Sequence, residues 1–185
     1  MITRNFDVLA NSDDMGLDLW TSGETIMNTS GSAVTLSGRY TANSTYRYYC
    51  LLRPKTFGTS PSSQWAPCIV FGQGNAPEDY TDYKITDPVS ITGTEDISHG
   101  YDVATRLCKF SGTAKIANTT DNDIVITEWG IYATVTFGSS TSNDFDYTLL
   151  TYRKLLDTPI TVHSGETVKI KLSYEIPFSS NEPIE

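Results

Sequence analysis

The two histidines, His99 in DISHGYD and His163 beside a Ser-Gly-Glu turn, are the side chains best suited to acid–base catalysis. A histidine activates a serine nucleophile when the fold also supplies an orienting carboxylate. The sequence contains no Gly-x-Ser-x-Gly motif, the signature of one large hydrolase class. We therefore expect no catalytic residues and no enzymatic activity, and we interpret His163 as a solvated turn residue.

A glycine pair in FGQGNAPEDY, Gly72 and Gly74, has the spacing that begins some phosphate-binding loops. Those loops need a third glycine or a Gly-Lys-Ser/Thr sequence, followed by a helix. Neither follows here. The pair therefore predicts a backbone turn, and we expect no bound cofactor.

Acidic residues at Asp121, Asp123 and Glu128 resemble part of a calcium-binding loop. The EF-hand pattern requires a glycine at its sixth position, whereas Ile124 to Ile126 fill the middle of this stretch. The segment SDDMGLD fails in a similar way. We expect no metal site, and a calcium-binding loop stays open as an alternative.

Aromatic side chains could instead bind sugars, and the chain has 11 Tyr and three Trp. Aromatic residues are also common in strands and cores. Trp129 falls in phase with Ile131 and Val135, which predicts a core position. Trp20 and Trp65 lie in expected loops and could serve a glycan-binding module.

The composition narrows the classes of partner. With 185 residues and a net charge of −9, the chain lacks the clustered Lys and Arg that nucleic acids require. No apolar run has the roughly 20 residues of a membrane span, and the start lacks the apolar core of a signal peptide. We expect folding in a cytoplasm, with Cys50, Cys68 and Cys108 as buried thiols.

Strands must position all these residues, because alternation of apolar and polar residues dominates the second half of the chain. The fold predicted is all-β: an antiparallel β-sandwich, jelly-roll-like, with an extended N-terminal segment. Helical periodicity is nearly absent, and the only candidates for short helices lie at 77–83 and 97–105. Strands are expected at 24–27, 33–36, 46–53, 68–72, 106–117, 124–137, 145–156, 159–162 and 168–176. Expected core residues are Phe110, Ile116, Trp129, Ile131, Val135, Ile170, Leu172 and Tyr174.

Residues 1–45 are more polar than the β-sandwich domain expected at 46–185. They nevertheless keep five large apolar side chains, which we interpret as contacts to a neighbouring subunit. The alternative is that this arm covers an edge of its own sandwich, which would protect that edge from aggregation. The five residues are Phe6, Leu9, Leu17, Leu19 and Trp20.

Three segments in the C-terminal part, together spanning residues 68–178, resemble a family of tailed-bacteriophage virion structural proteins. The first is a Gly-x-Gly turn followed by Pro and Asp-Tyr, in FGQGNAPEDYTDYKI. The second is Thr-Glu-x-Gly-Ile-Tyr, in ITEWGIYATV, where Trp129 replaces the commoner aliphatic residue. The third is an Arg followed by Thr-Pro-Ile-Thr-Val and a Gly-Glu turn, in LLTYRKLLDTPITVHSGETVKIKLSYEI.

The resemblance implies a non-enzymatic component of a phage particle, without a cofactor. We expect a capsid decoration or head-fibre component, made in the host cytoplasm, that assembles as a homo-oligomer and with other virion proteins such as the major capsid protein or a tail component. Nucleic acid and membranes are not expected partners. The alternative is a glycan-binding module at a tail or fibre tip that recognises the host.

Overall fold

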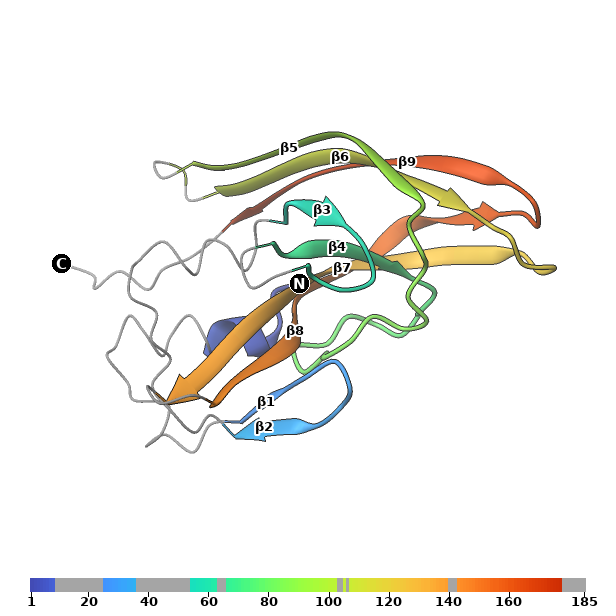
Figure 1. The fold of residues 1–185 in the computed structure, drawn as a ribbon. Helices are drawn as coiled ribbons and strands as arrows, with labels where there is room; N and C mark the ends of the chain where they lie inside the picture. The colour runs from blue at the N-terminus through green and yellow to red at the C-terminus, as the bar shows by residue number, and fades with distance from the viewer. Residues whose placement is uncertain are drawn as a thin grey trace.

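Two β-sheets face each other in the computed structural model, which describes residues 1–8, 25–35, 54–62, 66–102, 105, 107–139 and 143–177. The upper sheet in Figure 1 has the order β5-β6-β9, and the lower sheet has the order β3-β4-β7-β8. The fold is therefore an all-β sandwich, as predicted. Strands β1 and β2 form a separate hairpin.

The strand bounds follow the alternation of the sequence most closely in the second half. The described residues contain nine strands: β1 (Thr25–Met27), β2 (Ala33–Thr35), β3 (Thr56–Phe57), β4 (Cys68–Gly72), β5 (Gly93–Asp102), β6 (Leu107–Ala117), β7 (Ile124–Ser139), β8 (Asn143–Val162) and β9 (Thr167–Pro177). All the pairings are antiparallel except that of β3 with β4, which is parallel over two residues.

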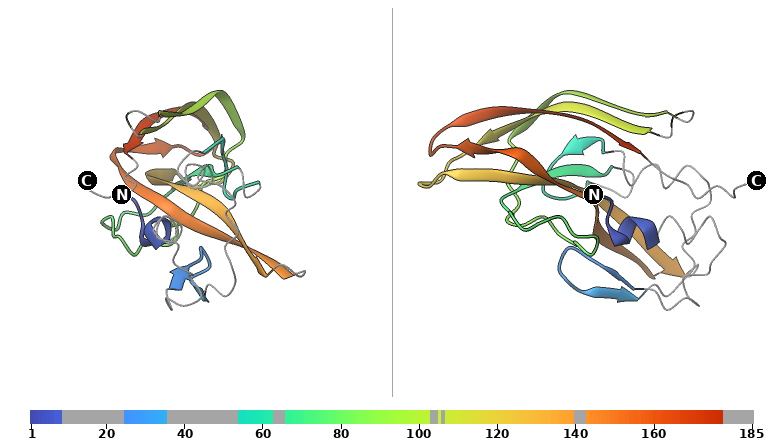
Figure 2. Two further views of the ribbon diagram at one scale, coloured as in Figure 1. Left: turned by 90° about the vertical axis from the view of Figure 1, so that its left-hand side faces the viewer. Right: turned by 180° about the vertical axis from the view of Figure 1, so that it is seen from behind.

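The chain crosses between the sheets after β4, after β6 and after β8, so each sheet combines strands that are distant in sequence. Two long hairpins, β5–β6 and β7–β8, lie in opposite layers. The view from behind shows the two layers running along the length of the molecule (Figure 2, right).

Side chains from both sheets fill the space between them. Five of the eight expected core residues are buried, namely Phe110, Ile116, Trp129, Ile131 and Ile170. Leu172 and Tyr174 pack against this core but stay partly accessible, because β9 is an edge strand. The side chain of Val135 lies outside the described residues.

Aromatic rings connect the two layers. The ring of Tyr174 on β9 lies 5.5 Å from that of Phe110 and 4.8 Å from that of Trp129 on the opposite sheet. The ring centroid of Phe57 lies 5.3 Å from that of Phe110. Contacts of this kind add about 0.5–1.5 kcal/mol each beyond the area they bury.

Neither helix candidate is helical where the structure describes it. Residues 97–102 belong to β5, where pairing with β6 overrides the local sequence. Residues 77–83 form a turn in which aspartate side chains accept backbone N–H groups: Asp79 N donates to Asp82 Oδ2, and Thr81 N donates to Asp79 Oδ1. Such side-chain acceptors compete with helical hydrogen bonds.

A short helical turn at 4–8, which the sequence did not predict, lies beside β8 (Figure 1). The strands predicted at 145–156 and 159–162 are one strand, β8, interrupted by a bulge. Between the pairs Ile126↔Ile160 and Glu128↔Leu155, residues 156–159 lie opposite the single residue 127. The strand predicted at 46–53 lies outside the described residues.

Candidate functional site

The three segments that carry the resemblance meet at one place, on the outer face of the four-stranded sheet. The loop at 73–87 crosses this face, over β4, β7 and β8. Beneath it is a second, smaller core that comprises Cys68, Val70, Ile85, Tyr132 and Leu150. This explains why all five residues of β4 are buried, since the main core covers one face and the loop covers the other.

Glu128 and Arg153 anchor the loop to the sheet. Arg153 Nε donates to Glu128 Oε2 at 2.6 Å, and Arg153 Nη1 donates to Asp82 Oδ2 at 2.8 Å. The remaining guanidinium contacts are to the Pro77 and Ala76 carbonyls, at 3.1 and 2.9 Å. The guanidinium therefore binds two carboxylates and two backbone carbonyls, all but one of which belong to the loop.

The other carboxylate oxygen of Glu128 holds the two ends of the loop. Oε1 accepts the Gly74 N–H at 3.1 Å and the Thr86 N–H at 2.7 Å. Tyr132 adds a third attachment, because its hydroxyl accepts the Ile85 N–H at 2.8 Å. Burial raises the pKa of Tyr132 to about 12, so this hydroxyl stays neutral.

Burial by itself would lower the pKa of the Arg153 guanidinium, but its hydrogen bonds to Asp82 and Glu128 outweigh that effect and raise the pKa. Arg153 is 3% exposed and Glu128 is fully buried. With both charges paired and both carboxylate oxygens of Glu128 occupied, the cluster leaves no acid or base directed at a substrate. Its chemistry is that of a structural anchor.

Glycines are required where the loop approaches the sheet. A Cβ at Gly74 would lie 2.8 Å from Glu128 Cδ and 2.8 Å from Thr86 Cβ. A Cβ at Gly130 would lie 2.6 Å from the Tyr152 carbonyl oxygen. Gly74 thus serves close packing on a carboxylate, while Gly72 is the last residue of strand β4 and not part of a turn.

The predicted arm residues are placed only in part. Phe6 is 2% exposed and packs in the core of its own chain. Leu9, Leu17, Leu19 and Trp20 lie outside the described residues, so their contact with a neighbouring subunit stays a prediction. The burial of Phe6 favours the alternative that the arm covers its own sandwich.

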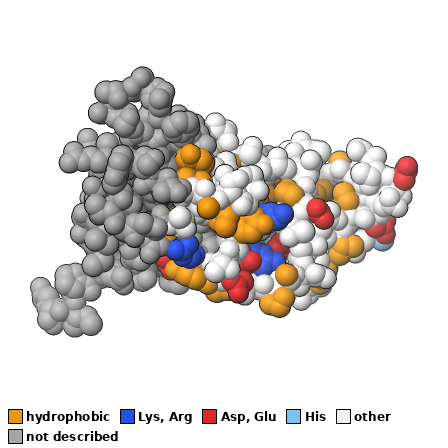
Figure 3. Space-filling view, turned by 90° about the horizontal axis from the view of Figure 1, so that it is seen from below, with side chains coloured by type: hydrophobic (Ala, Val, Ile, Leu, Met, Phe, Trp, Pro, Cys, Tyr) orange, Lys and Arg blue, Asp and Glu red, His pale blue; other side chains and the backbone are white. Residues whose placement is uncertain are grey.

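Residues 1–3 and 29 cover part of the free edge of β8. Thr3 N donates to the Thr151 carbonyl at 3.1 Å, and Arg153 N donates to the Met1 carbonyl at 3.0 Å. Farther along β8, Thr29 N donates to the Thr148 carbonyl at 3.1 Å. The face that carries β8 and the β1–β2 hairpin mixes hydrophobic side chains with charges of both signs (Figure 3).

The histidines do not form a hydrolytic centre in the described residues. His163 Nδ1 lies 2.8 Å from Asp123 Oδ2, but the neighbouring Ser164 hydroxyl donates to the Thr120 carbonyl at 2.7 Å. A hydrogen bond to Asp123 raises the pKa of His163. His99 is on β5, opposite Phe110. The fold brings no serine into a triad with either ring in this part of the chain.

The acidic residues considered for calcium binding and the tryptophans considered for sugar binding do not form a site in the described residues either. Glu128 is anchored inside, whereas Asp121 is exposed and Asp123 pairs with His163, so the three do not converge. No group of three or more potential metal ligands occurs among the described residues. Trp129 is 3% exposed, while Trp20 and Trp65 lie outside the described residues.

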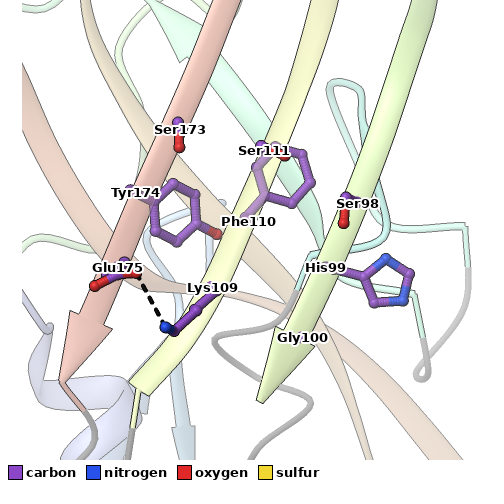
Figure 4. Close-up of a pocket in the computed structure, with 9 residues that line it drawn as sticks. All are labelled: Ser98, His99, Gly100, Lys109, Phe110, Ser111, Ser173, Tyr174 and Glu175. Carbon is purple, nitrogen blue, oxygen red and sulfur yellow. Dashed lines mark ion pairs between the residues drawn. The ribbon is translucent and has the colours of Figure 1, made fainter. Parts of the chain in front are cut away.

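A shallow polar trough of about 320 Å³ crosses the outer face of the upper sheet (Figure 4). One wall is a row of serines on three strands, because Ser98 pairs with Ser111 and Ser111 pairs with Ser173. The next outward-facing row includes the Lys109–Glu175 ion pair, at 3.2 Å. The trough has small hydroxyls and paired charges, which suit contact with a polar surface.

No family model, curated protein or solved structure matches this chain. Within the described residues, no helix is long and apolar enough to cross a membrane.

Proposed function

We propose that this protein is a non-enzymatic structural component of a bacteriophage virion, placed on the head as a capsid decoration or head-fibre component. The observation that carries the proposal is the convergence of the three resembling segments on one buried cluster. Gly74 and Asp82 come from the first segment, Glu128 from the second and Arg153 from the third. Because these residues contact one another, the three segments form one structural unit.

The chemistry of the described residues supports the same proposal. The strongest buried interactions fix a loop, and the buried Cys68 thiol has a pKa raised to about 12 by desolvation, which makes it a poor nucleophile. The two sheets give the protein broad surfaces for contact. Its net charge of −9 favours solubility, which suits a particle component present at high local concentration. Its partners are other virion proteins and further copies of itself.

Electron microscopy of purified particles tests the proposal. Antibodies against the folded protein should label heads, and mass spectrometry should find the chain in particles purified by density gradient. Labelling at the tail tip would instead support the glycan-binding alternative. Absence of the chain from purified particles, with the protein abundant in the infected-cell lysate, would overturn the virion assignment.

A further inference from the structure

Strand β9 is an edge strand whose outer side has no partner among the described residues. It pairs with β6 along its whole length of 11 residues without a register shift. Two of the other edges, β8 and β5, are different. Residues 1–3 and 29 cover part of β8, the bulge at 156–159 interrupts it further, and a register shift between Glu95 and Ser98 interrupts β5, where Asp96 has a φ of 54°.

The ladder also shows which backbone groups of β9 are free to pair. Asn118 N donates to the Glu166 carbonyl, which marks 118 and 166 as residues whose polar groups face each other. Since these groups alternate in direction along a strand, even-numbered residues of β9 bond to β6. On the far side of β6, Thr92 N donates to the Lys115 carbonyl, as this alternation requires. The free N–H and C=O groups of β9 are therefore those of its odd-numbered residues.

The sequence of β9, TVKIKLSYEIP, is complementary to itself in the antiparallel direction. If two copies pair about a two-fold axis at Leu172, Lys169 of each copy lies opposite Glu175 of the other. On the inner face, Ile170 then lies opposite Tyr174. Opposite charges and aromatic–aliphatic pairs across antiparallel strands both stabilise pairing.

We propose that β9 is a self-association edge, at which a second copy of this chain adds its own β9 antiparallel and joins two three-stranded sheets into one of six strands. The hydrogen-bonded pairs are Lys169 with Glu175 and Lys171 with Ser173. Leu172 meets its own symmetry mate at a non-hydrogen-bonded position. This interface is isologous, which is how most homodimers form, and it does not depend on the virion assignment.

Lysines on an edge strand also discourage pairing in many proteins. Here the register about Leu172 compensates Lys169 with a glutamate. In the single chain these two residues bond to neighbours on the same sheet, Lys169 to Glu95 at 2.7 Å and Glu175 to Lys109 at 3.2 Å. Both pairs are exposed, so exchanging them for contacts across the two-fold axis costs little.

Sedimentation velocity over a concentration series tests the edge with the full chain. We expect a monomer–dimer equilibrium. Lys169→Glu should raise the dissociation constant of the dimer about tenfold or more, because it places two like-charged pairs across the interface. Glu175→Lys should do the same, and the double exchange Lys169→Glu with Glu175→Lys should restore dimerisation. Lys115→Glu is the matched control, because it changes the same charge on the same face in the middle strand, and it should have no effect.

A disulfide cross-link tests the register in which the two β9 strands pair. Leu172→Cys should give a disulfide-linked dimer under mild oxidation, because the two symmetry-related positions are directly opposite. Wild type under the same oxidant controls for Cys50, Cys68 and Cys108. A chain that is monomeric at every concentration, or a dimer in which the double exchange restores nothing and Leu172→Cys does not cross-link, would overturn the proposal. Circular dichroism and melting curves for each variant show that the fold is intact.

Discussion

Glu128 is a fully buried carboxylate in which each oxygen has a donor, two backbone N–H groups on one and a guanidinium on the other. The importance of such a group for stability becomes visible when its charged partner is removed. Replacing a whole buried ion pair by apolar residues is often neutral, whereas removing one partner leaves a charge in a low-dielectric site. The pair with Arg153 is therefore best tested one side at a time.

We predict that Arg153→Met lowers the free energy of unfolding by about 3–5 kcal/mol, because it leaves Glu128 buried without its partner. The Asp82 and carbonyl contacts of the loop are lost with it. Urea denaturation followed by tryptophan fluorescence measures the change. Lys109→Met, which breaks the exposed pair with Glu175, should change the same quantity by less than about 1 kcal/mol. Equal effects from the two variants would contradict the role of burial.

The His163–Asp123 pair predicts a pH dependence at one end of the sandwich. The pair raises the pKa of His163 above its ordinary 6.5 and lowers the pKa of Asp123 below its ordinary 3.8. The raised histidine pKa favours the folded state at pH below 6.5, and this contribution disappears as pH rises through the folded pKa. The lowered aspartate pKa favours the folded state above 3.8, and this contribution disappears as pH falls through the folded value.

An NMR titration of the His163 ring checks this directly. Asp123→Asn should bring the pKa of His163 back toward 6.5, because the variant loses both the carboxylate hydrogen bond and its charge. Asp121→Asn is the control, because it removes an exposed carboxylate of the same loop that does not pair with the His163 ring. An unchanged His163 titration in Asp123→Asn would show that the pair does not form in solution.

At the scale of elements, the loop at 73–87 behaves as a lid that is fixed over the small core. We predict that Gly74→Ala destabilises the fold by about 1–3 kcal/mol, because the added methyl group must displace Glu128 or Thr86. Gly100→Ala is the matched control, since a Cβ there has no neighbour within 4 Å. Thermal melting compares the two, and a Gly74 variant as stable as the Gly100 variant would contradict the close packing.

The N-terminal residues are a second element with a testable role. Deleting residues 1–8 should lower the melting temperature and the solubility, because it removes Phe6 from the core and uncovers backbone groups of β8. Phe6→Ala alone should cost about 3–5 kcal/mol. Asp7→Ala, on the same helical turn but only half-buried, is the control. A truncated chain with unchanged melting that no longer self-associates would favour the intersubunit arm instead.

The long strands could be predicted because their alternation persists over many residues; β6 and β9 are examples. The anchor could not, since Glu128 and Arg153 meet only through the register of β7 and β8. Strand β5 could not be predicted, because its polar sequence does not alternate between apolar and polar residues. Pairing with β6 determines its conformation. The glycine pair was predicted to form a turn, whereas Gly72 ends strand β4 and Gly74 packs on a carboxylate that lies 54 residues away in the sequence.

At the scale of the whole molecule, stability comes from two cores on either side of one sheet, without a metal-ligand cluster in the described residues. We predict that EDTA leaves the melting temperature and self-association unchanged. Differential scanning fluorimetry with and without added Ca²⁺ measures this. A fall of many degrees on chelation would show that an acidic loop binds a structural calcium ion, because a ligand of the native state stabilises it by mass action.

The coverage of β8 has a consequence for the order in which the chain can fold. Thr3 bonds to Thr151 and Met1 bonds to Arg153, so contacts at the β8 edge join residues that are far apart in the sequence, and β8 is synthesised well after its partner. Phe6 therefore has no complete binding surface until β8 has been made. Contacts between residues so distant in sequence slow folding. Residues 1–8, although synthesised before β8, thus reach their native place only after it.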